Sequence, residues 1–139
     1  SIIRLLDIFE NETDIYLVME YMRGGDLFDY LQRRDFTIDE KLACNFAHQI
    51  ATAIFYLHSY GVAHRDLKPE NIIVSDDSDH PEVKITDFGL SKIVGPKENS
   101  KEPFGTLSYA APEILQGLPY NKSVDVWSLG IILFLILSG

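Results

Sequence analysis

Acidic, amide and basic side chains lie close together between His64 and Asn71, and a further acid follows at Asp87. Asp66, Asn71 and Asp87 supply carboxylate and amide oxygens, the ligand atoms that Mg2+ prefers in proteins. Lys68 adds a compact positive charge of the kind that contacts phosphate. Together these residue types predict a site that holds the phosphates of a nucleotide and a metal ion.

The order of the motifs along the chain carries more information than any single motif. Asp66 and Asn71 have the D-x-x-x-x-N spacing, and they are followed by Asp87-Phe88-Gly89, Ala111-Pro112-Glu113 and Trp127-Ser128-x-Gly130. In this order the motifs resemble the catalytic loop, the metal-binding element and the activation segment of eukaryotic protein kinases. The resemblance covers nearly all 139 residues, from the hinge into the C-terminal lobe.

The resemblance implies an α+β fold, that of a partial protein kinase domain. Residues 1–20 would form N-lobe strands, residues 21–25 the hinge, and residues 26–139 an incomplete C-lobe up to its central hydrophobic helix. Because a kinase domain is far longer than this chain, we expect a fragment or a partial gene model. Such a piece would lack the Gly-rich loop and the phosphate-anchoring lysine, so we expect little activity from it alone.

The sequence before the site predicts two strands and a short helix. Residues 2–9 and 15–20 are predicted strands. The second strand is apolar on both faces, so we expect it in the interior of a sheet. Asp26 is well placed to cap a helix over residues 27–33.

Residues 37–60 predict the longest helix of this part of the chain. Thr37 and Glu40 have the spacing of a capping box at its start. Gly61 is expected to end the helix, and Cys44 is expected to pack in the core. His58 is expected to be a structural residue, because no Cys or His partner lies at metal-binding spacing.

Two further elements flank the site. Residues 72–74 and 83–85 predict a short pair of strands. The apolar residues after Trp127 predict a helix buried on all sides, as a central scaffold requires. By the resemblance, Asp125 would bond the backbone of the turn at His64 and Arg65.

The resemblance also implies a nucleotide site for ATP. The backbone groups of Glu20 and Met22 would bond the adenine edge, and Ile73 would lie beneath the ring. Asp26 would reach the ribose, although many similar kinases have the longer glutamate at that position. The backbone carbonyl of Glu70 would also lie near the ribose. Without the neighbouring motifs, Met22 and Ile73 would be read as core residues.

Phosphoryl transfer depends mainly on positioning and on neutralising charge. By the resemblance, Asn71 and Asp87 would hold Mg2+ between the phosphates of ATP, and Lys68 would contact the γ-phosphate. Asp66 would orient the incoming hydroxyl, since a free aspartate pKa of about 3.9 makes it a poor early base. Thr106 would bond both Asp66 and Lys68.

The catalytic loop also indicates a class of substrate. His64-Arg65-Asp66-Leu67-Lys68-Pro69-Glu70-Asn71 resembles Ser/Thr kinases, whereas tyrosine kinases usually carry alanine and a displaced arginine here. The motifs resemble most the calcium/calmodulin-dependent group. Leu107-Ser108 departs from many relatives, which have proline after Gly-Thr. A protein substrate is therefore expected, and Asp26 and Glu70 could face basic residues before its target Ser or Thr.

Arg65 and Glu102 suggest a form of regulation. An arginine before the catalytic aspartate commonly pairs with a phosphorylated residue of the activation segment. At the usual phosphosite, three residues before Gly105, this chain has Glu102. We hypothesise that Glu102 partly replaces a phosphate, with a solvated loop glutamate as the alternative.

The composition narrows the range of partners and compartments. A net charge of −9 argues against a nucleic-acid or anionic-membrane surface, and it suits basic peptides or simply a solvated acidic surface. A single cysteine gives no disulfide framework, so a cytoplasmic location is expected, with the nucleus left open as another intracellular site. The apolar run over residues 131–137 is shorter than the roughly 20 residues that a membrane span needs.

Two other functions are compatible with parts of the sequence. A pseudokinase or nucleotide-binding scaffold would retain the fold without transfer, and the presence or absence of a Gly-rich loop and a Val-Ala-x-Lys strand upstream would decide this. A small-molecule phosphotransferase is disfavoured by the Ala111-Pro112-Glu113 motif, because that element serves peptide docking.

Overall fold

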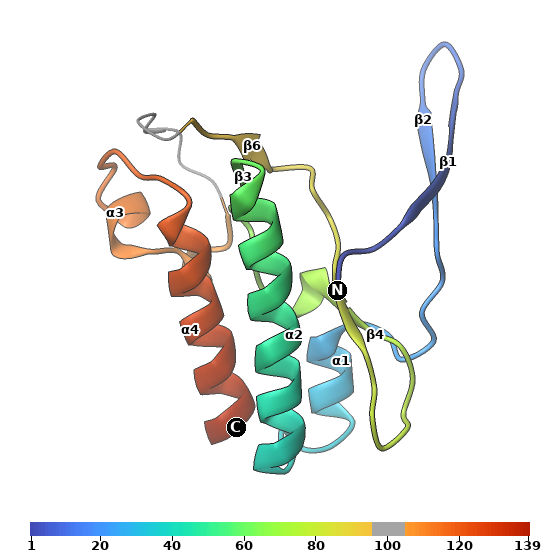
Figure 1. The fold of residues 1–139 in the computed structure, drawn as a ribbon, viewed down its shortest axis with the longest axis vertical. Coiled ribbons are helices and arrows are strands. Elements are labelled where there is room, and N and C mark those ends of the chain that lie inside the picture. Colours follow the sequence, from blue (N-terminus) through green and yellow to red (C-terminus); the bar gives the residue numbers. More distant parts are fainter. Residues whose placement is uncertain (96–104) are drawn as a thin grey trace.

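The computed structural model describes residues 1–95 and 105–139, and Figure 1 shows their path. The strands are β1 (Leu5–Glu10), β2 (Ile15–Met19), β3 (Val62–Ala63), β4 (Ile72–Val74), β5 (Val83–Ile85) and β6 (Lys92–Ile93). The helices are α1 (Leu27–Gln32), α2 (Glu40–Ser59), α3 (Pro112–Leu115) and α4 (Ser123–Ser138). Single 3-10 turns lie at Pro69–Asn71 and Leu107–Tyr109. Mainly helical structure with small two-stranded sheets agrees with the expected α+β class.

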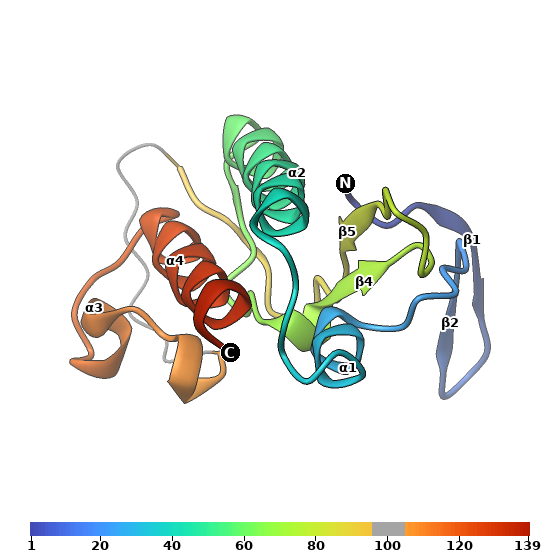
Figure 2. The same ribbon diagram turned by 90° about the horizontal axis from the view of Figure 1, so that it is seen from below.

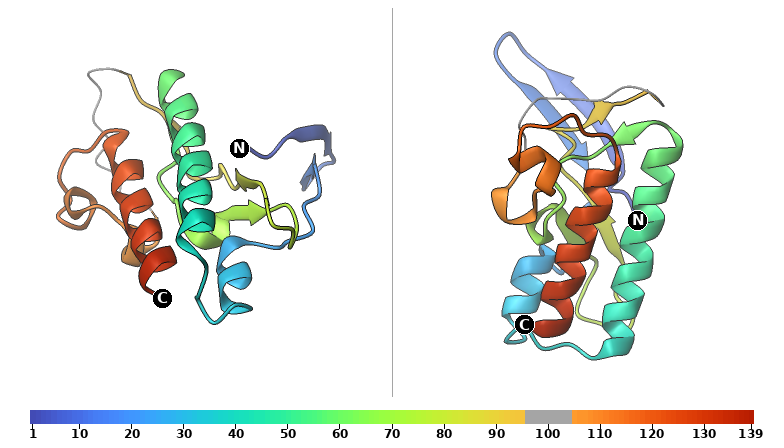
Figure 3. Two further views of the ribbon diagram at one scale, coloured as in Figure 1. Left: turned by 60° about the horizontal axis from the view of Figure 1, so that its bottom comes forward. Right: turned by 90° about the vertical axis from the view of Figure 1, so that its left-hand side faces the viewer.

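The helices and the β4–β5 pair enclose one main core. α2 and α4 run antiparallel and side by side (Figures 1 and 3), and α1 and β4–β5 pack beside α2. Residues 72–74 and 83–85 pair antiparallel with the bounds expected from the sequence. The core consists of buried apolar residues from all these elements, among them Leu27, Tyr30, Phe46, Ile50, Ile72, Ile85, Ile132 and Ile136. The loop that carries His64 to Asn71 lies directly on this core. Leu67 of that loop belongs to the core and so fixes the loop to it.

The β1–β2 hairpin stands apart from the helices (Figures 1 and 2). Its strands pair antiparallel, but every residue of β2 is exposed. The prediction that this strand is interior is therefore wrong for the described residues. A two-stranded ribbon leaves both faces open unless other elements cover them, and sequence hydrophobicity does not say which elements do so.

Helix α2 begins later than the sequence suggested. Its N-cap is Asp39, whose carboxylate accepts a hydrogen bond from the Leu42 amide at 2.9 Å. The hydroxyl of Thr37 instead donates to the carbonyl of Asp35 at 3.2 Å. The predicted capping box of Thr37 and Glu40 is therefore wrong, because Glu40 is already the first helical residue and Asp39 alone can reach the free amides of the first turn.

Two burial predictions also change. Cys44 is exposed rather than in the core, because it lies outside the apolar stripe that contains Ala43 and Phe46. Helix α4 is buried on one side only, along Val124, Asp125, Ser128, Ile132 and Ile136. Its other side exposes Val126, Trp127, Phe134 and Leu137, so the expected all-round burial does not hold among the described residues. Gly61 follows α2 with φ of 76°, in the helix-ending role that was predicted.

Replacing Phe46 by alanine is expected to destabilise the fold. Phe46 is fully buried and packs edge-to-face on Tyr30, with ring centroids 5.7 Å apart. Loss of the ring should lower the free energy of unfolding by about 3–5 kcal/mol, measured by urea denaturation. Phe55→Ala is the matched control, because Phe55 is 76% exposed on the same helix and should cost about 0.5 kcal/mol. Equal losses in the two variants would contradict the assigned core.

Candidate active site

Asp66 lies at the centre of a hydrogen-bond network that joins the catalytic loop to the segment after Gly105. Its Oδ1 accepts from the Thr106 amide at 2.9 Å and from the Thr106 hydroxyl at 3.0 Å. Its Oδ2 lies 3.2 Å from the Lys68 ammonium and accepts from the Asn71 amide group at 3.1 Å. Lys68 also donates to the Thr106 hydroxyl at 2.9 Å. The structure thus brings together Asp66, Lys68, Asn71 and Thr106, the four residues predicted to be catalytic.

Gly105 permits this contact between the two segments. Its φ is 89°, a conformation that side chains disfavour. A Cβ placed on Gly105 would lie 2.7 Å from the carbonyl oxygen of Arg65, which is closer than such atoms approach. The backbone can therefore press against the catalytic loop only because residue 105 has no side chain.

His64 connects the catalytic loop to the segment that carries Asp87. Its buried ring donates from Nε2 to the carbonyl of Thr86 at 2.9 Å and packs edge-to-face on Phe88, 5.1 Å between centroids. These contacts pack the catalytic loop against the segment that carries Phe88. Thr86 also donates its amide to the carbonyl of Asn71 at 2.9 Å, which places Asp87 one residue from a direct contact with the catalytic loop.

Asp125 holds the catalytic loop from below, as the resemblance implied. Its carboxylate accepts the amide of His64 at 2.9 Å and the amide of Arg65 at 2.9 Å. Arg65 has φ of 71°, a strained conformation for a residue with a side chain, with a cost of about 1–3 kcal/mol. Two hydrogen bonds to a buried carboxylate offset that cost just before Asp66. The sequence did not reveal that His58 also reaches Asp125, with Nε2 at 2.8 Å from Oδ2.

Arg65 is buried and its guanidinium is already engaged. It donates from Nε to the carbonyl of Leu90 at 2.6 Å and from a terminal nitrogen to the hydroxyl of Tyr120 at 3.2 Å. Leu90 lies three residues after Asp87, so Arg65 ties the segment that carries Asp87 to the catalytic loop. Glu102, the proposed phosphate substitute, lies outside the described residues, and its pairing with Arg65 stays a hypothesis.

Asp87 is exposed and has φ of 58°. Its carboxylate accepts the Gly89 amide at 3.2 Å and lines a pocket whose other walls come from the β1–β2 hairpin and the same turn. The other lining residues of that pocket are Ile3, Leu5, Leu17, Met19, Thr86, Phe88 and Gly89. In residues 1–95 and 105–139 no three His, Cys, Asp or Glu side chains form a metal cluster.

The residues expected to hold the nucleotide lie around the connector between β2 and α1. The connector is bonded to the end of β4, with the Gly24 amide donating to the Val74 carbonyl at 3.0 Å. Asp26 forms a β-bridge with Ile73, and its carboxylate caps α1 by accepting from Asp29 at 2.8 Å. The structure thus brings Asp26 and Ile73 together. It also shows that the Asp26 side chain already has a structural role.

Glu20, Met22 and Glu70 differ in their surroundings. The Glu20 carboxylate accepts from the Lys84 ammonium at 2.8 Å, and this ammonium is the main reason that the pKa of Glu20 lies below its ordinary value. The Glu20 amide donates to the Arg4 carbonyl at 3.0 Å. Met22 is half-buried in the connector, and Glu70 is exposed. Their contacts with adenine and ribose remain predictions.

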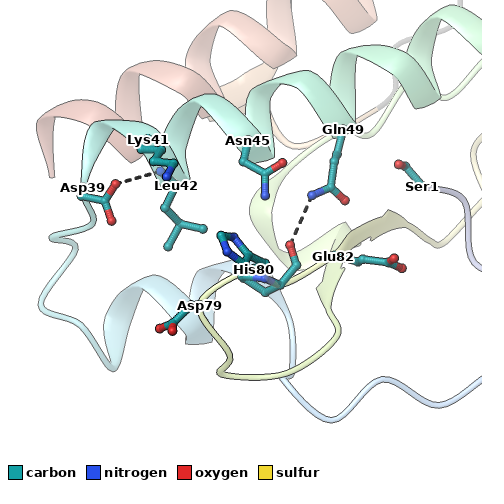
Figure 4. Close-up of a pocket in the computed structure, with 10 residues that line it drawn as sticks. Ser1, Asp39, Lys41, Leu42, Asn45, Gln49, Asp79, His80 and Glu82 are labelled. Carbon is teal, nitrogen blue, oxygen red and sulfur yellow. Dashed lines mark hydrogen bonds between the residues drawn. The ribbon is translucent and has the colours of Figure 1, made fainter.

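A second pocket lies between α2 and the loop that joins β4 to β5 (Figure 4). Gln49 crosses it, donating to the Pro81 carbonyl at 3.2 Å and accepting from the Val83 amide at 2.8 Å. Asp39, Lys41, Asp79 and His80 are among its other lining residues. The pocket shares no residue with the Asp66 network, and its bonds serve to attach the loop to α2.

The arrangement defines a class: an Asp-Lys-Thr network, bonded through His64 to the segment that carries a loop aspartate and placed on a mainly helical lobe, is typical of the protein kinase fold. The protein kinase domain model matches residues 1–139, so the chain belongs to the protein kinase domain family. A probable myosin light chain kinase of Dictyostelium discoideum is 48% identical over the whole of this chain and 36% of its own length. Myosin light chain kinase A of the same organism is 43% identical over the whole chain and 47% of its own length.

Human calcium/calmodulin-dependent protein kinase type IV is 45% identical over the whole chain and 29% of its own length. Within the family the chain is therefore of the eukaryotic Ser/Thr type and similar to the calcium/calmodulin-dependent group, which confirms that resemblance. The chain spans 29% to 47% of the length of these relatives. None of the helices in the described part of the chain is long and apolar enough to cross a membrane.

Proposed function

We propose that this chain forms the catalytic part of an ATP-dependent Ser/Thr protein kinase, which transfers the γ-phosphoryl group of ATP to a protein hydroxyl. The observation that carries this proposal is the Asp66 network, in which one carboxylate, one ammonium and one hydroxyl lie within 3.2 Å of one another. This arrangement supports phosphoryl transfer because it presents an acceptor for a hydroxyl beside a cation for a phosphate.

Asp66 orients the attacking hydroxyl. Its carboxylate accepts four contacts from Thr106, Lys68 and Asn71, which fix its position in the loop. A substrate hydroxyl can most easily replace the bond that the Thr106 hydroxyl donates to Asp66. Thr106 would then still keep the bond that its oxygen accepts from Lys68. A serine or threonine hydroxyl in its place would point one lone pair away from Asp66 and toward the phosphate.

Lys68 supplies positive charge to the transferred phosphoryl group. Its ammonium has three protons, and two of them face Thr106 and Asp66. The third is available to a phosphate oxygen, where the developing negative charge of the transition state would be stabilised.

Asn71 and Asp87 fit a nucleotide-bound Mg2+. The Asn71 amide nitrogen donates to the Asp66 carbonyl at 2.8 Å, so the side chain is turned with its nitrogen toward the loop and its oxygen away from it. The exposed Asp87 carboxylate supplies a negatively charged oxygen from the adjacent segment. When bound, Mg2+ with ATP neutralises the phosphates and supplies the phosphoryl group.

Glu70 is the acid best placed to contact a peptide. It is exposed at the edge of the catalytic loop. Burial raises the pKa of Tyr109, and the negative charge of Glu70 adds to that increase, which places this charge near the segment after Thr106. The net charge of −9 also favours basic peptides.

A peptide library tests the proposed specificity in the full-length protein. We expect transfer to Ser and Thr, transfer to Tyr at least about 100-fold slower, and a preference for arginine before the target residue. Glu70→Gln should reduce the arginine preference by about 5- to 10-fold in kcat/KM. Asp79→Asn is the control, since Asp79 lies on the loop after β4 and should leave the preference unchanged. Equal use of Tyr would contradict the Ser/Thr assignment, and no arginine preference would contradict the role of Glu70.

A further inference from the structure

A buried residue in the connector between β2 and α1 takes one of its hydrogen bonds from a side chain at the far end of α1. Gly24 is buried, and its amide donates to the Val74 carbonyl at the end of β4. The Gly24 carbonyl accepts from the guanidinium of Arg33, with 2.6 Å between Nη2 and the oxygen. In the described part of the chain, no other donor reaches this oxygen. Because a carbonyl removed from water costs free energy when it has no partner, Arg33 completes the hydrogen bonding of the connector.

The two glycines of the connector make this bond important. A Cβ placed on Gly24 would lie 2.6 Å from the carbonyl oxygen of Val74, so the connector backbone lies directly against β4. Gly25 follows with φ of 75°, in the left-handed region that glycine adopts at little cost. Glycine permits this path, but it also leaves the chain free to take other paths. A bond to the Gly24 carbonyl therefore limits how far the connector can move from β4.

Arg33 reaches the connector by folding back along α1. Its amide ends the helix by donating to the Asp29 carbonyl at 3.0 Å, and a helix of six residues is about 9 Å long. A long side chain is therefore needed to return to Gly24, two residues before the N-cap. Nη2 of Arg33 also lies 3.8 Å from the Asp77 carboxylate, but the Asp77 side chain is 60% exposed, and exposed ion pairs contribute little. The bond to Gly24 is therefore the contact with a structural effect.

The backbone of the same connector is expected to contact adenine, and Met22 lies two residues before Gly24. We propose that Arg33 is a positioning residue for the adenine nucleotide: it acts through the Gly24 carbonyl to hold the connector, and with it the backbone of Met22, against β4. The part of this inference that concerns the nucleotide rests on the proposed kinase function. The structural part, which concerns the pairing of the connector with β4, does not.

Two variants of the full-length protein test the bond. Arg33→Met keeps an unbranched stem and removes the donor, whereas Arg33→Lys keeps a cationic donor, which is sufficient for a single carbonyl. The amides of Arg23 and Gly24 are paired with the end of β4, so their exchange with deuterium reports on the connector. For Arg33→Met we expect these two amides to exchange about 10-fold faster, with unchanged exchange in α2. We also expect the Kd for Mg2+-ATP to rise about 5- to 10-fold, with kcat at saturating ATP within about twofold of the parent. Arg33→Lys should remain within about twofold in all three measurements.

Asp77→Asn is the control for the ion pair. It removes the carboxylate near Arg33 and leaves the donor to Gly24 in place, so exchange at residues 23 and 24 and the Kd for Mg2+-ATP should stay within about twofold of the parent.

Each other outcome overturns the proposal. Unchanged exchange at residues 23 and 24 in Arg33→Met would show that the connector does not depend on the bond. Equally faster exchange in α2 would assign Arg33 to general stability. The same losses in Arg33→Lys or in Asp77→Asn would show that the donor to Gly24 is not the cause, and faster exchange with an unchanged Kd would show that the bond does not position the nucleotide. If the parent protein binds no ATP, the proposed function fails, and the exchange data still decide whether Arg33 holds the connector.

Discussion

Asp66→Asn in the full-length protein is expected to lower kcat by about 1,000-fold or more, with a small change in the KM for ATP. The amide keeps the size of the carboxylate and can still accept on one oxygen from Thr106. Asparagine has only one side-chain oxygen, so its amide nitrogen would take the place of the second carboxylate oxygen. That nitrogen would face the Lys68 ammonium or the Asn71 amide, which are both donors. The substrate hydroxyl would therefore meet a neutral and weaker acceptor, and the network would lose its negative charge. Single-turnover phosphorylation of a serine peptide measures the effect.

The control for Asp66 must remove the same charge elsewhere. Asp79→Asn makes the identical chemical change on the exposed loop between β4 and β5 and should leave kcat within about twofold. Circular dichroism on both variants establishes that they fold alike. A kcat for Asp66→Asn within tenfold of the parent would refute the orienting role of this carboxylate, and with it the central part of the proposed mechanism.

Asp87→Asn has the second largest expected effect, a loss of about 1,000-fold in kcat together with weaker nucleotide binding in Mg2+. A neutral amide replaces the one carboxylate among the residues that line the pocket beside the β1–β2 hairpin. The loss should appear in the dependence on Mg2+, because a cation ligand has been weakened. The Asp87 carboxylate also accepts the Gly89 amide, a bond that asparagine can preserve, so the turn should survive.

Nucleotide titration with and without Mg2+ provides the measurement for Asp87. We expect the affinity for Mg2+-ATP to fall about tenfold or more, whereas binding without metal should change little. Asp79→Asn again serves as the charge-matched control. An unchanged requirement for Mg2+ in Asp87→Asn would place the cation ligand elsewhere.

Local patterns in the sequence predicted most of the elements but not their burial. The strand pair at residues 72–74 and 83–85 and the cap at Asp26 matched, because both follow from neighbouring residues. The start of α2 was misplaced by choosing Thr37 over Asp39, two residues on. The exposure of β2 and of Cys44 depends on which distant segments cover them, and periodicity within one element does not contain that information.

In the site, likewise, the sequence predicted the residue types but not most of the contacts between distant residues. The residue types around Asp66 were visible in the sequence, but the contacts with Thr106 join residues 40 apart, and only the family resemblance anticipated them. The bond from His58 to Asp125 joins residues 67 apart. His58 was recognised only as a structural residue, since no nearby partner in the sequence marks it. A buried carboxylate that serves several donors becomes apparent only when the chain is folded.

Gly105 has a consequence for sequence change in this site. A methyl group at residue 105 would collide with the carbonyl of Arg65. Even alanine would therefore push the segment after Gly105 away from the catalytic loop. This shift would move the neighbouring Thr106 away from Asp66 without changing any functional group. We therefore expect that even a small side chain at Gly105, a position that bears no chemistry of its own, would disturb the site.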